Sequence, residues 1–308
     1  MIFSRAEKIY AWTCLILLAL CGIGLLYNAI DQHYPLNLQI FIDRAAFFVL
    51  FSIVYCGLLL FPQKTASKQL LRIAKTSALT INAIALMGMI SLVTLCAPGP
   101  MHDHVIDNVD RAMRFHLLPI LRFMFDHPWI RPPLMILYFA PILLYQALPF
   151  FLTLTEESHE RILVFFTATN IALITGHLIF YFYPTMTSPA AIYPHQYFTH
   201  FELATYHAFK LEHYHHAVNF KFLGGVISFP SFHAIWITML AYFLWPKFGK
   251  WAIFFAAIAI YAVLFTGWHY FADMIAGVII AYFSIKLSEY LIVDRSISLD
   301  LLTNQSSL

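Results

Sequence analysis

Two short segments of the chain each place a histidine where a helix is expected to begin. In the first, residues 228–234 (SFPSFHA), Pro230 suits a first helical turn and is followed by Ser231 and His233. A helix N-terminus offers free N–H groups and the positive end of the helix dipole, so it attracts phosphate. The same pattern also fits an ordinary helix cap followed by a packed histidine.

The second segment, residues 267–273 (GWHYFAD), contains a histidine and an aspartate four positions apart. On a helix, His269 and Asp273 would share one face and could touch. A carboxylate that binds one imidazole nitrogen fixes the tautomer and makes the other nitrogen more basic. The spacing therefore predicts a nucleophilic histidine with an orienting aspartate, although a structural pair at a helix start has the same spacing.

The composition shows what kind of protein must position these groups. Of 308 residues, 61% are hydrophobic and only 11% are charged, against roughly 25% charged residues in an ordinary soluble domain. A soluble protein of this size cannot hide so much apolar surface, so the sequence predicts an all-α, polytopic membrane protein. A net charge of +2 gives no basic surface for nucleic acid, and disordered or disulfide-built secreted proteins are excluded too.

Eight segments are apolar enough to be membrane helices. They comprise residues 10–30, 45–61, 75–97, 132–154, 161–183, 233–245, 251–267 and 271–293. The sixth and seventh are short and are separated only by residues 246–250, which predicts a tight helical hairpin.

Basic residues predict the orientation of these helices. Residues 63–75 contain four basic residues and no acid, which places this loop and both chain termini in the cytoplasm. Residues 98–131 and 184–229 then form two long outer loops. The same count of basic residues places both motifs at the outer face of a cell (inner) membrane. Except for His159 and His177, the histidines also fall in outer loops or at outer helix ends.

The two motifs together resemble those of a known family. Pro230-Ser231-x-His233 followed by His269-x-x-x-Asp273 is similar to the signature of the type 2 phosphatidic acid phosphatase (PAP2) superfamily. The wording FPSFHA and HYFADMIAG most resembles its inositolphosphotransferase branch, which includes the fungal inositol phosphorylceramide synthases. Further similarity lies in residues 107–111, 127–138 and 183–189, so that the resemblance covers about residues 103–281.

The resemblance implies roles for three residues and an outline of the domains. The residue matching His269 attacks phosphorus to give a phosphohistidine, the one matching Asp273 orients it, and the one matching His233 protonates the leaving group. A PAP2-like catalytic core of six helices would span residues 75–293. Two additional transmembrane helices (1–74) would precede it, and a polar cytoplasmic tail (294–308) would follow.

The chain also departs from the phosphatases of that superfamily. They carry a Lys-x6-Arg-Pro motif and a Ser-Arg pair before the nucleophile, whereas this chain has Ala262 and Val263 in place of the pair and no Lys or Arg between residues 177 and 189. A phosphoryl group in transfer needs cationic or N–H stabilisation. The candidates for binding substrate phosphate are Ser231, Lys210, Lys221 and Arg131.

No metal or other cofactor is expected, because histidine itself would be the nucleophile. Four outer-loop histidines could bind zinc or copper, but their spacing matches no closed zinc site. They are His207, His213, His215 and His216. A substrate-contacting pocket rim or a simple interfacial loop is the alternative for these residues.

The predicted function is a lipid phosphotransferase whose partners are membrane lipids and which moves a phosphate-bearing headgroup through a phosphohistidine. One alternative is a lipid phosphate phosphatase, and the choice depends on whether water is excluded from the second step. A non-catalytic transporter or channel is the alternative of a different class, although the spans contain almost no charge for an ion path. An enzyme of this kind needs His233 and His269 to lie within several ångströms of each other and to face one cavity.

Overall fold

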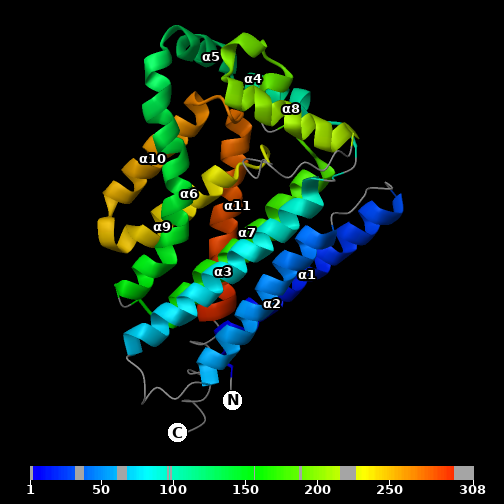
Figure 1. Ribbon diagram of the computed structural model, residues 1–308. Helices are drawn as coiled ribbons and strands as arrows, with labels where there is room; N and C mark the ends of the chain where they lie inside the picture. The colour runs from blue at the N-terminus through cyan, green and yellow to red at the C-terminus, as the bar shows by residue number, and fades with distance from the viewer. Residues whose placement is uncertain are drawn as a thin grey trace.

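The computed structural model describes residues 3–31, 38–60, 68–95, 97, 99–155, 157–186, 189–215 and 227–294. Over these residues the chain is helical, with short turns between helices (Figure 1). The helices are α1 (Arg5–Asp31), α2 (Leu38–Leu60), α3 (Lys68–Leu95), α4 (Asp103–Ala112), α5 (Leu117–Asp126), α6 (Arg131–Leu154), α7 (His159–Phe182), α8 (His200–His215), α9 (Phe232–Phe248), α10 (Lys250–Phe265) and α11 (Phe271–Glu289).

The all-α prediction is confirmed, and each of the eight predicted segments is a helix. Six of them, α1, α2, α3, α6, α7 and α11, are long and apolar enough to cross a membrane. The other two, α9 and α10, have 17 and 16 residues and form the predicted hairpin. Their connection is shorter than the predicted residues 246–250, because Pro246 lies in the last turn of α9 and only Gly249 separates the two helices.

Two further differences from the sequence analysis affect the site. The loops predicted before and after α6 and α7 contain three unpredicted helices, α4, α5 and α8. Helix α2 begins at Leu38 instead of residue 45, so that Arg44 lies inside the helix. The predicted polar tail, apart from Asp294, lies outside the described residues.

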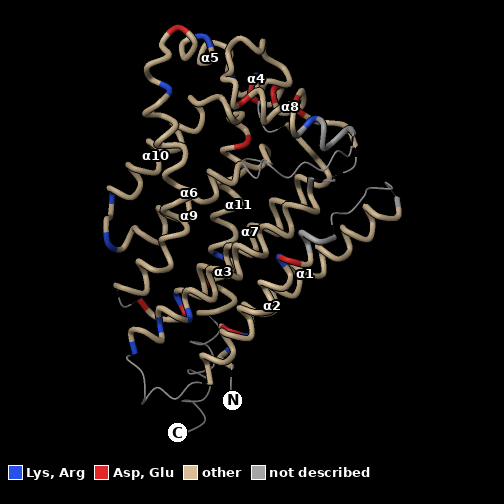
Figure 2. The backbone as a smooth tube through the Cα atoms, in the orientation of Figure 1, with Lys and Arg blue, Asp and Glu red and all other residues tan. Residues whose placement is uncertain are grey.

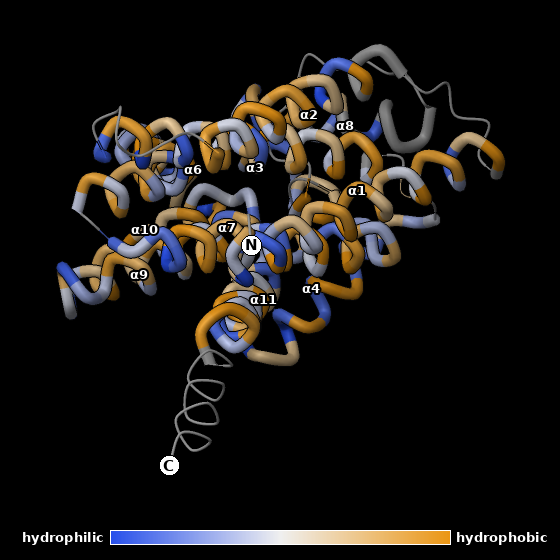
Figure 3. The backbone as a smooth tube through the Cα atoms, turned by 90° about the horizontal axis from the view of Figure 1, so that it is seen from below, coloured by the Kyte–Doolittle hydropathy of each residue, from blue (hydrophilic) through white to orange (hydrophobic). Residues whose placement is uncertain are grey.

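The arrangement of the helices separates a packed centre from an apolar exterior. Helix α7 packs against α1, α3 and α11, while α2 lies along α3, and α9 contacts α6, α10 and α11. Large apolar side chains such as Ile23, Ile53, Leu143 and Phe255 are exposed on the outside, and hydrophobic residues dominate the helices seen from below (Figure 3). Charged residues gather mostly near the two ends of the bundle (Figure 2), as a membrane environment requires.

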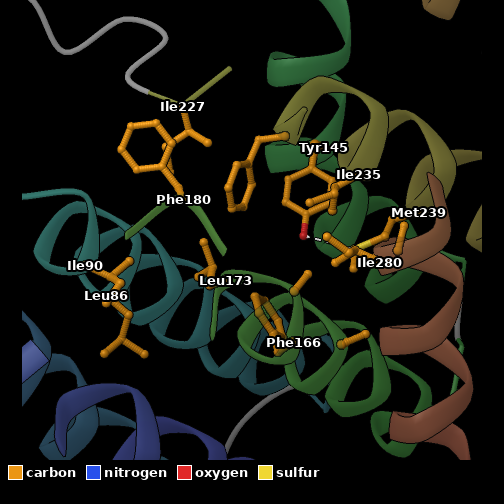
Figure 4. Close-up of a cluster of buried hydrophobic side chains, with 14 of the residues drawn as sticks. Leu86, Ile90, Tyr145, Phe166, Leu173, Phe180, Ile227, Ile235, Met239 and Ile280 are labelled. Carbon is orange, nitrogen blue, oxygen red and sulfur yellow. Dashed lines mark hydrogen bonds between the residues drawn. The ribbon is translucent and has the colours of Figure 1, made fainter. Parts of the chain in front are cut away.

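The buried centre joins side chains of α3, α6, α7, α9 and α11 (Figure 4). Phe166 and Phe180 of α7 lie among residues of α3, α6, α9 and α11. Tyr145 donates a hydrogen bond to the sulfur of Met239 over 3.4 Å and so ties α6 to α9. This core fixes the positions of α9 and α11 relative to the other helices.

Close packing between α9 and α11 depends on Gly277. A Cβ atom at this position would lie 2.4 Å from the backbone oxygen of Ser231 and 2.7 Å from Cβ of Ala234. Both contacts are to parts of α9 that cannot move without shifting the helix. Only glycine therefore allows the two helices to approach this closely.

We expect Gly277→Ala to lower the free energy of unfolding by about 1–3 kcal/mol, because it overpacks a backbone contact. Thermal unfolding in detergent measures the effect. The matched control is Gly57→Ala on α2, where an added Cβ would meet nothing within 4 Å. A Gly277→Ala protein as stable as the control would contradict the close packing of α9 and α11.

Candidate active site

A hydrogen bond between backbone atoms joins the starts of α9 and α11. The amide of Ser231 donates a hydrogen bond to the carbonyl oxygen of Asp273 over 3.0 Å. Ser231 is also the N-cap of α9, and its hydroxyl accepts from the amide of Ala234 over 3.3 Å, as serine commonly does at this position. The two motifs, about forty positions apart in the chain, therefore form one local structure.

The imidazole of His269 is held through one nitrogen. Its Nδ1 lies 3.3 Å from Oδ2 of Asp273 and 3.2 Å from the carbonyl oxygen of Ser228. Both partners are acceptors, so the proton belongs on Nδ1. This tautomer leaves a lone pair on Nε2, the nitrogen that could attack an electrophile.

The second histidine faces that free nitrogen. Nδ1 of His233 lies 3.4 Å from Nε2 of His269, and the hydroxyl oxygen of Ser231 lies 3.5 Å from the same Nε2. The ring of His233 packs on Tyr138, with centroids 4.1 Å apart, and its Nε2 has no hydrogen-bond partner within the described part of the chain. The structure thus brings together His233, His269, Asp273 and Ser231.

A cavity of about 270 Å³ opens in front of the two histidines. Its wall is largely aromatic and aliphatic, with rings from Tyr138, Phe232, Trp236 and Trp268. His177 also lines it, but both ring nitrogens of that residue have partners, the carbonyl oxygen of Leu173 at 2.8 Å and the Ser91 hydroxyl at 3.3 Å. The wall also includes Arg44, which the sequence analysis did not select.

The three cations selected from the sequence do not join this group in the described structure. Arg131 donates to the carbonyl oxygen of Tyr197, lies 3.7 Å from Glu202, and lines a different hollow. Lys210 is exposed on α8, with its nitrogen 5.9 Å from the centre of the Tyr206 ring. Lys221 lies outside the described residues.

Of the four outer-loop histidines, only His207 has a described side chain, and it does not line the cavity. His207 is exposed and packs near His195, with ring centroids 5.8 Å apart. The side chains of His213 and His215, and all of His216, lie outside what the structure describes. Among the side chains that are placed, no three His, Cys, Asp or Glu residues group as metal ligands.

Two buried aspartates on α4, Asp103 and Asp110, contact the turn that carries His269. The carboxylate of Asp110 accepts from the amides of Phe271 and Ala272 over 2.8 and 2.7 Å, so it caps α11. Asp103 accepts from the amide of Met186 over 3.0 Å and from the hydroxyl of Tyr270 over 3.4 Å. A carboxylate at a helix N-terminus is stabilised by the free amides and the helix dipole.

The sequence analysis did not identify these aspartates as supporting residues. Their signal was present, because Asp103, Asp107 and Asp110 follow a spacing of four and then three positions, which puts them on one helix face. That face is buried in the structure, where Asp107 accepts a hydrogen bond from the Tyr193 hydroxyl and pairs with Arg111. Acids on one face of a short helix are more often solvated, so only the fold reveals their role.

Burial raises the pKa of Asp103 from 3.8 to about 6, and the negative charge of Asp273 adds to the rise, whereas the amide of Met186 opposes it. A folded pKa above the unfolded value means that the folded state binds the proton more tightly. This contribution to stability is present below pH 4 and is lost as pH rises through about 6.

We expect the Tm advantage of the unchanged protein over Asp103→Asn to shrink between pH 4 and pH 7. Thermal unfolding in detergent at several pH values measures this difference, and Asp110 cancels because it titrates in both proteins. An advantage that is constant or grows with pH would show that the Asp103 carboxyl is not held in its neutral form.

Comparison with known proteins gives a family match over the segment that contains both motifs. The family model described as the PAP2 superfamily matches residues 104–287, which is more than half of the chain. No curated protein and no solved structure was found to match. The matched segment contains both motifs and selects an enzyme over the non-catalytic transporter or channel. The chain belongs to the PAP2 superfamily and is a membrane-embedded enzyme of the phosphatase or phosphotransferase type that acts on lipid phosphate.

Proposed function

We propose that the protein is a lipid phosphotransferase that works through a phosphohistidine on His269. The observation that carries the proposal is the pair of acceptors on Nδ1, Asp273 at 3.3 Å and the Ser228 carbonyl at 3.2 Å. They hold the proton on the side of the ring away from His233, so Nε2 keeps its lone pair for phosphorus. Attack by Nε2 forms the N–P bond as the bond from phosphorus to the leaving oxygen breaks.

His233 would supply the proton that the leaving oxygen needs. It faces the same cavity as His269, and its ring is buried against Tyr138 and Trp236. Nε2 of His269 has a single in-plane lone pair, so its 3.4 Å contact with His233 must open before phosphorus can approach. In the second step His233 would accept the proton of the incoming alcohol, which returns it to its starting state.

The wall of the cavity favours transfer over hydrolysis. Phe232, Trp236 and Trp268 surround the histidines, and an apolar wall lowers the availability of water near a phosphohistidine. A bound alcohol can then compete for phosphorus. We propose that the chain belongs to the inositolphosphotransferase branch. The wording of its two motifs and the absence of the phosphatase-type Ser-Arg pair support this assignment.

We also propose that the cavity faces the outer side of a cell membrane and that both termini are cytoplasmic. Helices α4 and α8 lie at the end of the bundle where α9 and α11 begin, and the N-terminal end of α1 lies at the opposite end (Figure 1). Lys68, Arg72 and Lys75, which belong to the basic segment 63–75, lie in the first turns of α3, and α3 begins at that opposite end. The positive-inside rule assigns this end to the cytoplasm. The catalytic domain would comprise residues 75–293.

The test is product analysis with purified protein in lipid nanodiscs, with phosphatidylinositol or phosphatidic acid as donor. The acceptor is ceramide, or a diacylglycerol whose acyl chains differ from those of the donor so that the product can be told from the donor. We expect a new phosphorylated lipid that forms only with an acceptor. His233→Ala should lower turnover by roughly 10²–10⁴-fold, since it removes a general acid, and His269→Ala should abolish it. The exposed His104→Ala on α4 is the matched control and should keep full turnover.

Release of free phosphate at one rate with and without every acceptor would make the protein a phosphatase. Turnover that survives in His269→Ala would contradict the nucleophile. Unfolding temperatures of all variants exclude a loss of fold as the cause.

A further inference from the structure

One cation reaches the cavity from outside the matched segment. Arg44 lies on α2, about sixty positions before residues 104–287, yet it lines the same cavity as His233 and His269. The sequence analysis expected the first two helices to stand outside the catalytic core. The packing of α2 places Arg44 in the wall of the cavity that contains His233 and His269.

The route of this side chain depends on a glycine of the neighbouring helix. A Cβ atom at Gly88 on α3 would lie 1.9 Å from Nη1 and 2.8 Å from Cζ of Arg44. The guanidinium therefore crosses α3 where no side chain stands in the way. Any larger residue at Gly88 would force the guanidinium out of its position.

Arg44 shares the cavity wall with no acidic side chain of the described residues. The neighbouring Asp43 is exposed and is not among the described residues of this wall. Nε of Arg44 is buried and has no hydrogen-bond partner among the residues that the structure places. A half-buried cation without a counter-charge is costly in a membrane protein, so an anion bound beside it is strongly favoured.

The chemistry of the cavity identifies that anion. A guanidinium offers paired N–H donors that match two oxygens of a phosphate. The two histidines stand in the same wall, and the phosphatase-type Ser-Arg pair is replaced by Ala262 and Val263. The remaining wall is apolar enough to hold acyl chains or other lipid parts.

We propose that Arg44 binds the phosphate of the lipid donor, so that α2 completes the active site; this inference rests on the proposed function. Arg44 supplies the cation that stabilises phosphate charge during attack by His269. Gly88 is the positioning residue that lets it reach the cavity. Helix α2 is thus part of the catalytic unit, although it precedes the proposed catalytic domain.

The first test measures binding without turnover. Inactive His269→Ala protein in nanodiscs is titrated with inorganic phosphate, short-chain phosphatidic acid, or the uncharged diacylglycerol, and binding is followed by thermal shift. Adding Arg44→Gln should weaken phosphatidic acid binding by at least roughly tenfold, since a charge-assisted hydrogen bond is lost. Diacylglycerol binding should not change, and the inorganic phosphate arm shows whether free phosphate uses the same contact.

The second test separates position from charge in the otherwise unchanged protein. Arg44→Lys should recover part of the kcat/KM that Arg44→Gln loses. Gly88→Ala should also lower kcat/KM, because the added Cβ displaces the Arg44 guanidinium. This loss is expected even though alanine favours a helix more than glycine does. Gly57→Ala, a glycine of α2 with nothing within 4 Å of an added Cβ, is the matched control and should leave kcat/KM unchanged.

The proposal fails if His269→Ala protein with and without Arg44→Gln binds phosphatidic acid equally well. It also fails if Gly88→Ala matches Gly57→Ala in kcat/KM. If the unchanged protein turns over no phosphorylated lipid but Arg44 still determines phosphate affinity, the proposed function fails and the binding site stands.

Discussion

The site depends on the contacts made by one buried residue, Asp273. Its carbonyl oxygen accepts from the amide of Ser231, and its Oδ2 accepts from Ser228 and from the amide of Tyr270, at 3.0, 2.8 and 2.9 Å. The same Oδ2 lies 3.3 Å from Nδ1 of His269. A single aspartate therefore joins two helix starts and also selects the tautomer of His269, the proposed nucleophile. Hydrogen bonds to a buried charge contribute about 1.5–3 kcal/mol each, enough to fix this geometry.

Two further groups of residues lie around the site that contains Asp273. On one side, α4 places Asp103 and Asp110 against the turn that carries Tyr270 and caps α11. On the other side, an aromatic wall and Arg44 enclose the cavity. Asp103 and Asp110 accept hydrogen bonds from backbone amides, whereas Arg44 has no anionic partner among the described residues of the wall. This difference between the aspartates and Arg44 supports our proposal that the cavity binds an anionic group of the substrate.

The sequence was sufficient for the parts of the site that are local. His269 and Asp273 meet because residues four apart share a helix face, and Ser231 caps the helix that carries His233. The predicted helices were confirmed for the same reason, since a membrane span is a local run of apolar residues.

Contacts between distant elements could not be predicted in this way. Charge alone suggested Arg131 and Lys210, but Glu202 on α8 approaches the first, and the second is exposed. Arg44 was overlooked because its role depends on the packing of α2 over a glycine of α3. Helices α4, α5 and α8 were missed because they are short and amphipathic or polar, unlike the spans.

The most direct measurement is to trap the covalent intermediate. The protein is mixed with a lipid donor labelled in its phosphate, quenched at alkaline pH, which preserves phosphohistidine, and digested for mass spectrometry. The account predicts a labelled phosphate on His269, absent from His269→Ala protein. Label on His233, or no label on any histidine while the donor is turned over, would contradict it.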